Sequence, residues 1–200
     1  MTPEVKRAPW RPSEGAREAL IEAAHDLFMQ RDYDLVSTAE ILERSGVSRG
    51  ALYHHFPSKL DLFRAVYEAS ERRKIELIVA EVPAGSSPGE ALVAGARAYL
   101  RRCETDEEMR RIGLTQSRAV LGWEGWREAA TELGIGAVLG LVTAAIEAGE
   151  LSPHDPETTA LILLGALIEA AMLIVVAEDR PAARERSEAV IVDLFESLRR

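Results

Sequence analysis

The sequence has a single cysteine and few of the side chains that build metal or catalytic sites. Cys103 has no partner for an internal disulfide, and the first fifteen residues lack the apolar run of a signal peptide. These absences favour a cytoplasmic protein. The four histidines have no spacing typical of metal ligands, because the adjacent His54 and His55 would point about 100 degrees apart on a helix.

Motifs of several enzyme classes are also missing. The chain has no glycine-rich phosphate loop, no His-Glu-x-x-His zinc helix and no nucleophile elbow. We therefore expect no catalytic residues, no metal site and no cofactor, and we interpret the chain as a binding protein.

Negative charge is missing from one short segment of an otherwise acidic chain. Lysine and arginine number 24 against 33 aspartate and glutamate, and most of the excess acid lies beyond residue 64. The segment SGVSRGALYHHFPSK, residues 45–59, contains no carboxylate, and Arg44 stands directly before it. A local surface for anions is compatible with the low isoelectric point of the whole chain.

One run, residues 159–177, is apolar and long enough to cross a membrane. Glu169 stands at its middle, and neither end has an aromatic belt. A helix that is apolar nearly all round in a soluble chain is usually buried on two sides, in its own core and against a partner. We therefore expect no membrane partner.

Alternation typical of strands is absent, and helix formers dominate between breakers, so the sequence predicts an all-α fold of nine or ten helices. Residues 1–12, with three prolines, are predicted to be a flexible N-terminal arm. Capping signals begin helices after Ser13, Ser37, Ser48, Ser58 and Ser87. The long helix over about 58–81 has an inward stripe of Leu60, Phe63, Val66 and Tyr67.

Two of these helices are short and joined by a turn at Gly46, which is the pattern of a helix-turn-helix. With Leu52 and Phe56 inward, the second helix shows donors and small residues on its outer face. Starts of helices also offer free amides to phosphate, helped by the charge of Lys59. The predicted DNA-binding residues are Ser37, Thr38, Ser48, Arg49, Gly50, Tyr53, His54, His55 and Lys59.

The run TAEILERSGVSRGALYHHFPSKLDLF resembles the DNA-binding domain of the tetracycline-repressor (TetR) family of transcriptional regulators. The matching positions are Ile41, Gly46, Val47, Ser48, Leu52, Tyr53, His55, Phe56 and Lys59, whereas Thr38 stands where the family often has an apolar residue. LGWEGWREA resembles regulatory domains of one branch of the family. The resemblance implies a three-helix DNA-binding domain at 13–57 and a ligand-binding and dimerisation domain at 58–200.

The resemblance further implies a repressor, released from its operator by a small lipophilic or aromatic molecule. Its ligand pocket would draw on Tyr67, Tyr99, Cys103, Gln116, Trp123, Trp126 and Glu169. Glu169 needs a partner in so apolar a helix, and Arg118 is one candidate.

A helix-turn-helix protein reaches enough base pairs as a two-fold dimer on a palindromic double-stranded DNA operator. The last two helices carry excess apolar surface, so the predicted homodimer interface is Leu161, Leu164, Ile168, Met172, Val175, Val190, Leu194 and Leu198. The alternative left open is an α-helical adaptor that binds protein and does not recognise DNA.

Overall fold

Helices make up almost all of the chain that the structure describes. The computed structural model describes residues 14–199, and within this range there is no β-strand, only an isolated bridge between Leu151 and Arg199. The all-α prediction is confirmed. The predicted arm over residues 1–12 and the cap at Ser13 lie outside the described residues. The α-helices are α1 Glu14–Gln30, α2 Thr38–Ser45, α3 Arg49–His55, α4 Lys59–Ala80, α5 Pro88–Thr105, α6 Ser117–Ala130, α7 Gly136–Glu147, α8 Pro156–Val176 and α9 Arg180–Ser197.

Side-chain caps begin these helices where the sequence predicts them. Ser37 and Ser87 each form a complete capping box, with Glu40 and Glu90 as the reciprocal partners. The Ser48 hydroxyl accepts a hydrogen bond from the Ala51 amide at 3.3 Å. Each cap satisfies amides that the first helical turn leaves without an intrahelical partner.

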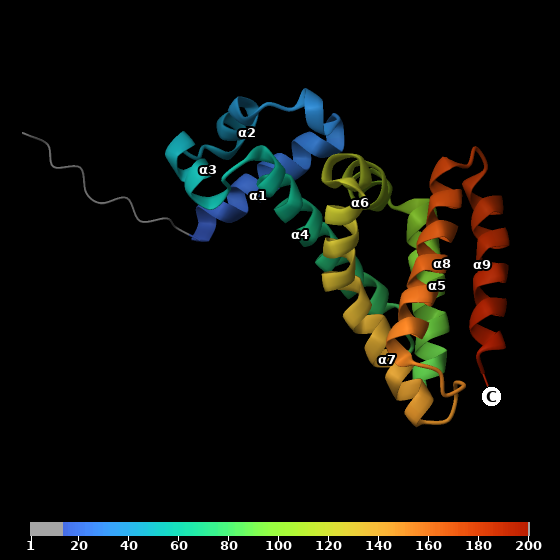
Figure 1. Ribbon diagram of the computed structural model, residues 1–200. Coiled ribbons are helices and arrows are strands. Elements are labelled where there is room, and N and C mark those ends of the chain that lie inside the picture. Colours follow the sequence, from blue (N-terminus) through green and yellow to red (C-terminus); the bar gives the residue numbers. More distant parts are fainter. Residues whose placement is uncertain (1–13, 200) are drawn as a thin grey trace, which may run out of the picture. The chain divides into compact units, whose positions relative to one another are not determined.

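The chain divides into two compact units, with the division between Val66 and Tyr67 inside α4. In the first unit α1 packs against α2 and α3 (Figure 1). Three rings fill its centre: Phe28 lies 5.1 Å from Phe63 and 5.8 Å from Tyr33, measured between centroids. Edge contacts between rings add to the stabilisation from burial alone.

The beginning of α4 differs from the predicted stripe at one position. Phe63, Val66 and Tyr67 are buried as predicted, but Leu60 is 43% exposed and Leu62 is fully buried in its place. Leu62 and Val66 lie four residues apart on one helix face, and Leu60 projects from another face.

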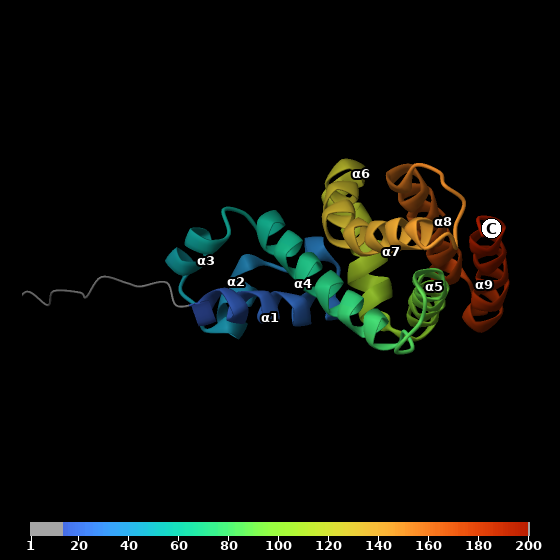
Figure 2. The same ribbon diagram turned by 90° about the horizontal axis from the view of Figure 1, so that it is seen from below.

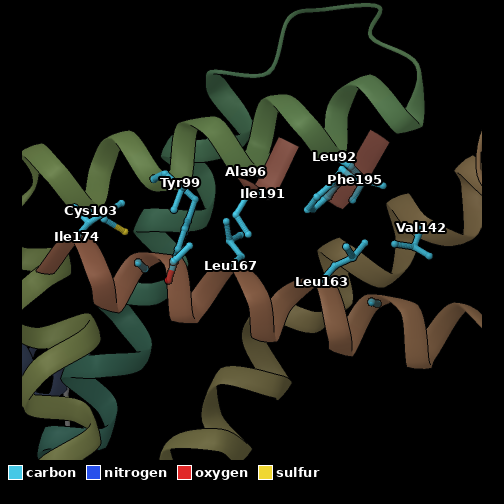
Figure 3. Close-up of a cluster of buried hydrophobic side chains, with 14 of the residues drawn as sticks. Leu92, Ala96, Tyr99, Cys103, Val142, Leu163, Leu167, Ile174, Ile191 and Phe195 are labelled. Atoms are coloured by element: carbon cyan, nitrogen blue, oxygen red, sulfur yellow. The ribbon is translucent and has the colours of Figure 1, made fainter. Parts of the chain in front are cut away.

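The second unit is a helical bundle in which α5 packs against α7, α8 and α9 (Figures 1 and 2). In both views α8 and α9 lie side by side. Figure 3 shows the centre of this core, where Tyr99 reaches from α5 toward α8, and Ile191 and Phe195 enter from α9. Small side chains of this core, such as Ala96 and Ala171, allow neighbouring backbones to approach.

Two stretches of widened π-helix interrupt the regular winding between α5 and α7. They are η2, Met109–Gln116, and η3, Thr131–Ile135; a short 3₁₀ turn, η1, spans Tyr33–Leu35 in the first unit. A kink within α6 has a separate cause, because Gly122 has φ 69° and ψ 174°, which a residue with a side chain rarely adopts.

The apolar run predicted over 159–177 is α8. By length and composition alone, two stretches of the described chain could span a membrane: Met109–Glu147 and Pro156–Val176. α8, however, supplies the buried residues Leu163, Leu167 and Ile174 to the core of the second unit. Its remaining apolar face lies at the surface, as expected for a helix buried on two sides in an assembly.

Candidate functional site

The turn between α2 and α3 is built around Gly46. Its φ of 67° and ψ of 10° are left-handed, and its amide donates to the Leu42 carbonyl at 3.0 Å, ending α2. Glycine adopts this conformation without the steric cost of a Cβ atom. Ser48 then caps α3 two residues later. The chain therefore reverses within three residues and gives α3 a defined starting point.

One face of α3 is anchored, and the other is exposed. Ala51 and Leu52 on the helix and Phe56 at its end are buried in the first unit. The opposite side of the segment shows the exposed residues Ser48, Arg49, Gly50, Tyr53 and His54. The Arg49 guanidinium carbon lies 5.7 Å from the centre of the Tyr53 ring, so the cation and the aromatic ring form one surface feature.

The start of α2 adds two more of the predicted residues. Ser37 is exposed and Thr38 is half-buried. The Glu40 carboxylate accepts hydrogen bonds from the Ser37 amide at 2.8 Å and from Arg31 at 2.7 Å. These bonds, first that from the Ser37 backbone, lower the pKa of Glu40 to about 2. The Glu40 carboxylate is thus occupied by donors of its own unit.

Lys59 and His55 are less accessible than the other predicted residues. The Lys59 ammonium donates to the Tyr33 carbonyl and lies 3.9 Å from the centre of the Tyr33 ring. Burial, the largest effect, lowers the pKa of Lys59. His55 is half-buried. Lys59 therefore ties the start of α4 to the segment before α2, and its charge has a fixed position.

The second unit contains an apolar cavity of about 160 Å³ that is partly open to solvent. Residues of α4, α5, η2, α6, η3, α7, α8 and α9 line it, mostly isoleucine, leucine, valine and alanine. Aliphatic walls of this kind exclude water and favour an apolar occupant. The polar lining consists of the buried Glu71, the mostly buried Lys74, and the rings of Tyr67, Tyr99 and Trp126.

Three of the seven pocket residues predicted from the sequence line this cavity: Tyr67, Tyr99 and Trp126. The other four lie elsewhere, for different physical reasons. Cys103 is fully buried beside Met109, and burial raises the pKa of its thiol to about 12. Gln116 is buried away from the cavity lining, whereas Trp123 is 62% exposed and Glu169 is on the surface of α8.

The pocket residues predicted from the sequence did not include Glu71 and Lys74, because the segment ERRKIEL, residues 71–77, has the composition of a solvated helix face. A stripe drawn through Tyr67, Ile75, Ile78 and Val82 passes through position 71, which divides the eight-residue gap between Tyr67 and Ile75 into two steps of four. That helical spacing is the signal that places Glu71 among the inward positions.

The exposed apolar surface of the last two helices differs in part from the predicted interface. Leu161 and Val190 are exposed as predicted, and so are Ile162, Leu173 and Val176, which were not predicted. Two predicted residues, Leu164 and Ile168, line the cavity instead. The last four, Met172, Val175, Leu194 and Leu198, are half-buried against the core. The difference has one source, because an apolar helix does not show in its sequence which face is inward.

Comparisons with known proteins agree with this architecture. The profile described as "Bacterial regulatory proteins, tetR family" matches residues 20–66, and "Tetracyclin repressor-like, C-terminal domain" matches residues 89–198, more than half of the chain. The chain is 26% identical over 148 residues to the transposon Tn10 TetC protein of Escherichia coli, with 74% of each chain covered.

Two further relatives are transcriptional regulators. The HTH-type transcriptional repressor BdcR of Escherichia coli (strain K12) is 35% identical over 103 residues, which cover 50% of this chain and 52% of BdcR. The crystal structure of a TetR-family transcriptional regulator from Pectobacterium atrosepticum is 30% identical, with a TM-score of 0.79 and 93% of this chain and 95% of that chain covered. Helix-turn-helix, helical bundle and sequence agree: the chain belongs to the tetR family of bacterial regulatory proteins, and it is a DNA-binding transcriptional regulator, not an enzyme.

Proposed function

We propose that this regulator is a cytoplasmic repressor. It binds a palindromic operator as a homodimer through α3 and is released by a small, mainly apolar effector in the cavity of its second unit. Residues 13–57 serve DNA binding, and residues 58–200 serve effector binding and dimerisation. The observation that carries the proposal is the exposed face of α3, which is free of carboxylates over residues 44–60 and anchored from behind.

The residues of this face suit different parts of a DNA duplex. Arg49, at the start of α3, is long enough to reach base edges, and Gly50 lets the backbone approach the groove. Tyr53 and His54 have donors for the phosphate backbone, as does the hydroxyl of Ser48. His55, half-buried, contributes mainly to holding α3 in place.

Helix starts complete the proposed phosphate contacts. Ser37 and Thr38 present the first amides of α2, where the helix dipole favours an anion. Lys59 adds a positive charge whose position is set by its contacts with Tyr33. Contacts of this kind fix the position of a protein on DNA, while base contacts specify the sequence.

Dimerisation follows from the apolar surface on α8 and α9. Ile162, Leu173 and Val176 are each more than 60% exposed, and Val190 on α9 is 68% exposed. Apolar side chains gathered in this way mark interaction surfaces. A second copy of the same chain, packed through a two-fold axis, would bury them and place two α3 helices on one duplex.

The direct test begins with selection of bound sites from genomic DNA. Binding to the selected site is then measured by fluorescence anisotropy between about 50 and 200 mM salt, where counterion release predicts a steep loss of affinity. Arg49→Ala and Tyr53→Ala should each weaken specific binding, the arginine change by about 1–3 kcal/mol. Arg127→Ala, which removes an exposed arginine from the second unit, is the control and should change little. Salt-independent binding, or equal effects of all three changes, would refute the proposal.

A further inference from the structure

The cavity of the second unit has one polar feature that an apolar effector does not require. Glu71 and Lys74, one helical turn apart on α4, form an ion pair in its wall. Only 9% of the Glu71 side chain and 13% of the Lys74 side chain are exposed. A buried pair costs more in lost hydration than it gains in stability unless its remaining donors and acceptors are satisfied.

Neighbouring groups hold this pair in the cavity wall. Lys74 lies 5.5 Å from the centre of the Tyr99 ring. On the other side, a Cβ atom at Gly113 would lie only 3.2 Å from Glu71 Oε1. The absence of a side chain at position 113 therefore allows the carboxylate to lie against η2. The polar groups Glu71, Lys74, Tyr67 and Tyr99 thus share the cavity wall with aliphatic residues: Ile78, Val82, Val138, Leu141, Leu163 and Leu164.

The indole N–H of Trp126 is a third polar group in the lining. Trp126 is 96% buried and lines the cavity, and no group meets hydrogen-bond geometry with its Nε1. Its neighbour is the Tyr67 hydroxyl: burial, the largest effect, raises the pKa of that hydroxyl, and the interaction with the Trp126 N–H lowers it. A buried donor without a well-aligned acceptor costs about 1–3 kcal/mol, and a ligand oxygen within reach would supply such an acceptor.

The charges of Glu71 and Lys74 restrict the net charge of the ligand that the cavity can bind. Glu71 and Lys74 neutralise one another, so an added carboxylate would compete with Glu71 for the ammonium and leave one anion uncompensated. An added ammonium would compete with Lys74 for the carboxylate and leave one cation uncompensated. Either outcome leaves a charge buried without its counterion, which is strongly unfavourable. A neutral hydroxyl can donate to the carboxylate and accept from a donor without displacing either partner.

The volume of the cavity restricts the size of the apolar part of the ligand. An apolar cavity of about 150 Å³ in another protein is known to bind benzene, so the cavity here accommodates about six carbon atoms. We infer that the effector is an uncharged molecule with a compact apolar body of this size and one hydroxyl group, which is bound by the Glu71–Lys74 pair and Trp126. The role of this molecule as an effector rests on the proposed function.

A series of probes with one shared ring tests the inference without DNA. The probes are cyclohexanol, cyclohexylamine, which is a cation at neutral pH, and cyclohexanecarboxylate. The full chain carrying Trp10→Phe and Trp123→Phe leaves Trp126 as its single tryptophan, so fluorescence reports directly on the cavity wall. Cyclohexanol should bind at least about tenfold more tightly than either charged probe, the ratio that 1.4 kcal/mol produces. Equal binding of the three probes, or preference for a charged one, would overturn the inference.

Substitutions within the pair should change which probe is preferred. Glu71→Gln leaves Lys74 without its counterion, so the carboxylate probe should gain affinity. Lys74→Met leaves Glu71 alone, so the ammonium probe should gain affinity. Leu77→Gln, an exposed position on the same helix, is the control and should keep the preference for cyclohexanol. An unchanged preference in both pair variants would contradict the inference, and circular dichroism with operator binding checks that each variant is folded.

The inference and the proposed function can fail separately. If another compound releases the operator while cyclohexanol shows no preference over its charged analogues, the inference is wrong and the proposed function stands. If cyclohexanol binds with the expected preference and operator binding does not respond to any effector, the inference about the cavity stands and the proposed release mechanism is wrong.

Discussion

The Arg118 guanidinium lies 3.7 Å from the Glu169 carboxylate, at the middle of the exposed apolar face of α8. The same guanidinium lies 4.5 Å from the centre of the Trp126 ring, which lines the cavity. Arg118 thus touches a residue of the cavity wall and a residue of the proposed dimer interface. Glu169 is 74% exposed in the single chain, so the pair contributes little to folding as it stands.

Dimerisation would change the energetics of this pair, because burying the outer face of α8 would remove the water that now solvates Glu169. We expect Arg118→Met to weaken the dimer by at least about tenfold, since it leaves the Glu169 charge buried without a partner. Glu169→Gln should affect the dimer less, and the double variant should recover most of the loss. Sedimentation at several protein concentrations measures the dimer dissociation constant. Equal losses in the two single variants would contradict this explanation.

A charge placed on the outer face of α8 should separate the dimer without unfolding the chain. Leu173 is 63% exposed, so Leu173→Glu should leave the far-ultraviolet circular dichroism and the melting of the monomer nearly unchanged. The dimer should dissociate and operator affinity should fall. Leu77→Glu makes the same change at an exposed leucine of α4 and should leave the dimer intact. A dimeric Leu173→Glu protein would exclude this face as the interface.

Two glycine substitutions in the helix-turn-helix should have opposite effects on stability. Gly46 has φ 67°, so Gly46→Ala should lower the free energy of unfolding by about 1–2 kcal/mol. Gly50 lies in α3 with no atom within 4 Å of an added Cβ, so Gly50→Ala should raise stability by up to about 1 kcal/mol. Gly50→Ala should nevertheless weaken operator binding, because the added methyl stands on the proposed DNA face. Urea unfolding and anisotropy measure the two effects separately.

Acid should destabilise the first unit in part through Glu40. The pKa of its carboxyl is about 2 in the folded chain against an ordinary value of 4.5, so its stabilising contribution is complete above pH 4.5. That contribution declines as the pH falls from 4.5 toward 2, because the unfolded chain takes up the proton first. Glu40→Gln should remove this part of the pH dependence, measured by urea unfolding at each pH. Glu43→Gln, an exposed position on the same helix, is the matched control.

Local signals in the sequence predicted the first unit well. Each short helix of the turn motif carries its own start and stop, with Ser37 and Ser48 as caps and Gly46 as the left-handed end of α2. Such signals act through neighbours within four residues, so they can be read without knowledge of the tertiary fold. The outward positions of α3 followed from the same spacing once Leu52 and Phe56 were taken as inward.

The second unit was harder to predict because its helices are apolar on several faces. Leu164 and Ile168 were assigned to the dimer interface, yet they line the cavity, while Ile162 and Leu173 are the exposed residues. In α8 the inward and outward faces have the same chemistry, and only packing against α5, α7 and α9 distinguishes them. Trp123 illustrates the same difficulty, since a tryptophan expected in a pocket lies largely in solvent.

By itself, the sequence determined the helical class, most helix starts and the face of α3 free of carboxylates, because these depend on short-range spacing and capping. The Arg118–Glu169 contact confirms the partner that the sequence suggested for Glu169. Only the tertiary structure decided where the cavity lies, that Glu71 and Lys74 meet in its wall, and that Arg118 also contacts Trp126. Apart from the Glu71–Lys74 spacing on α4, these features bring together side chains from different helices. Their relative placement depends on how side chains of many residues fill one core, which no local pattern contains.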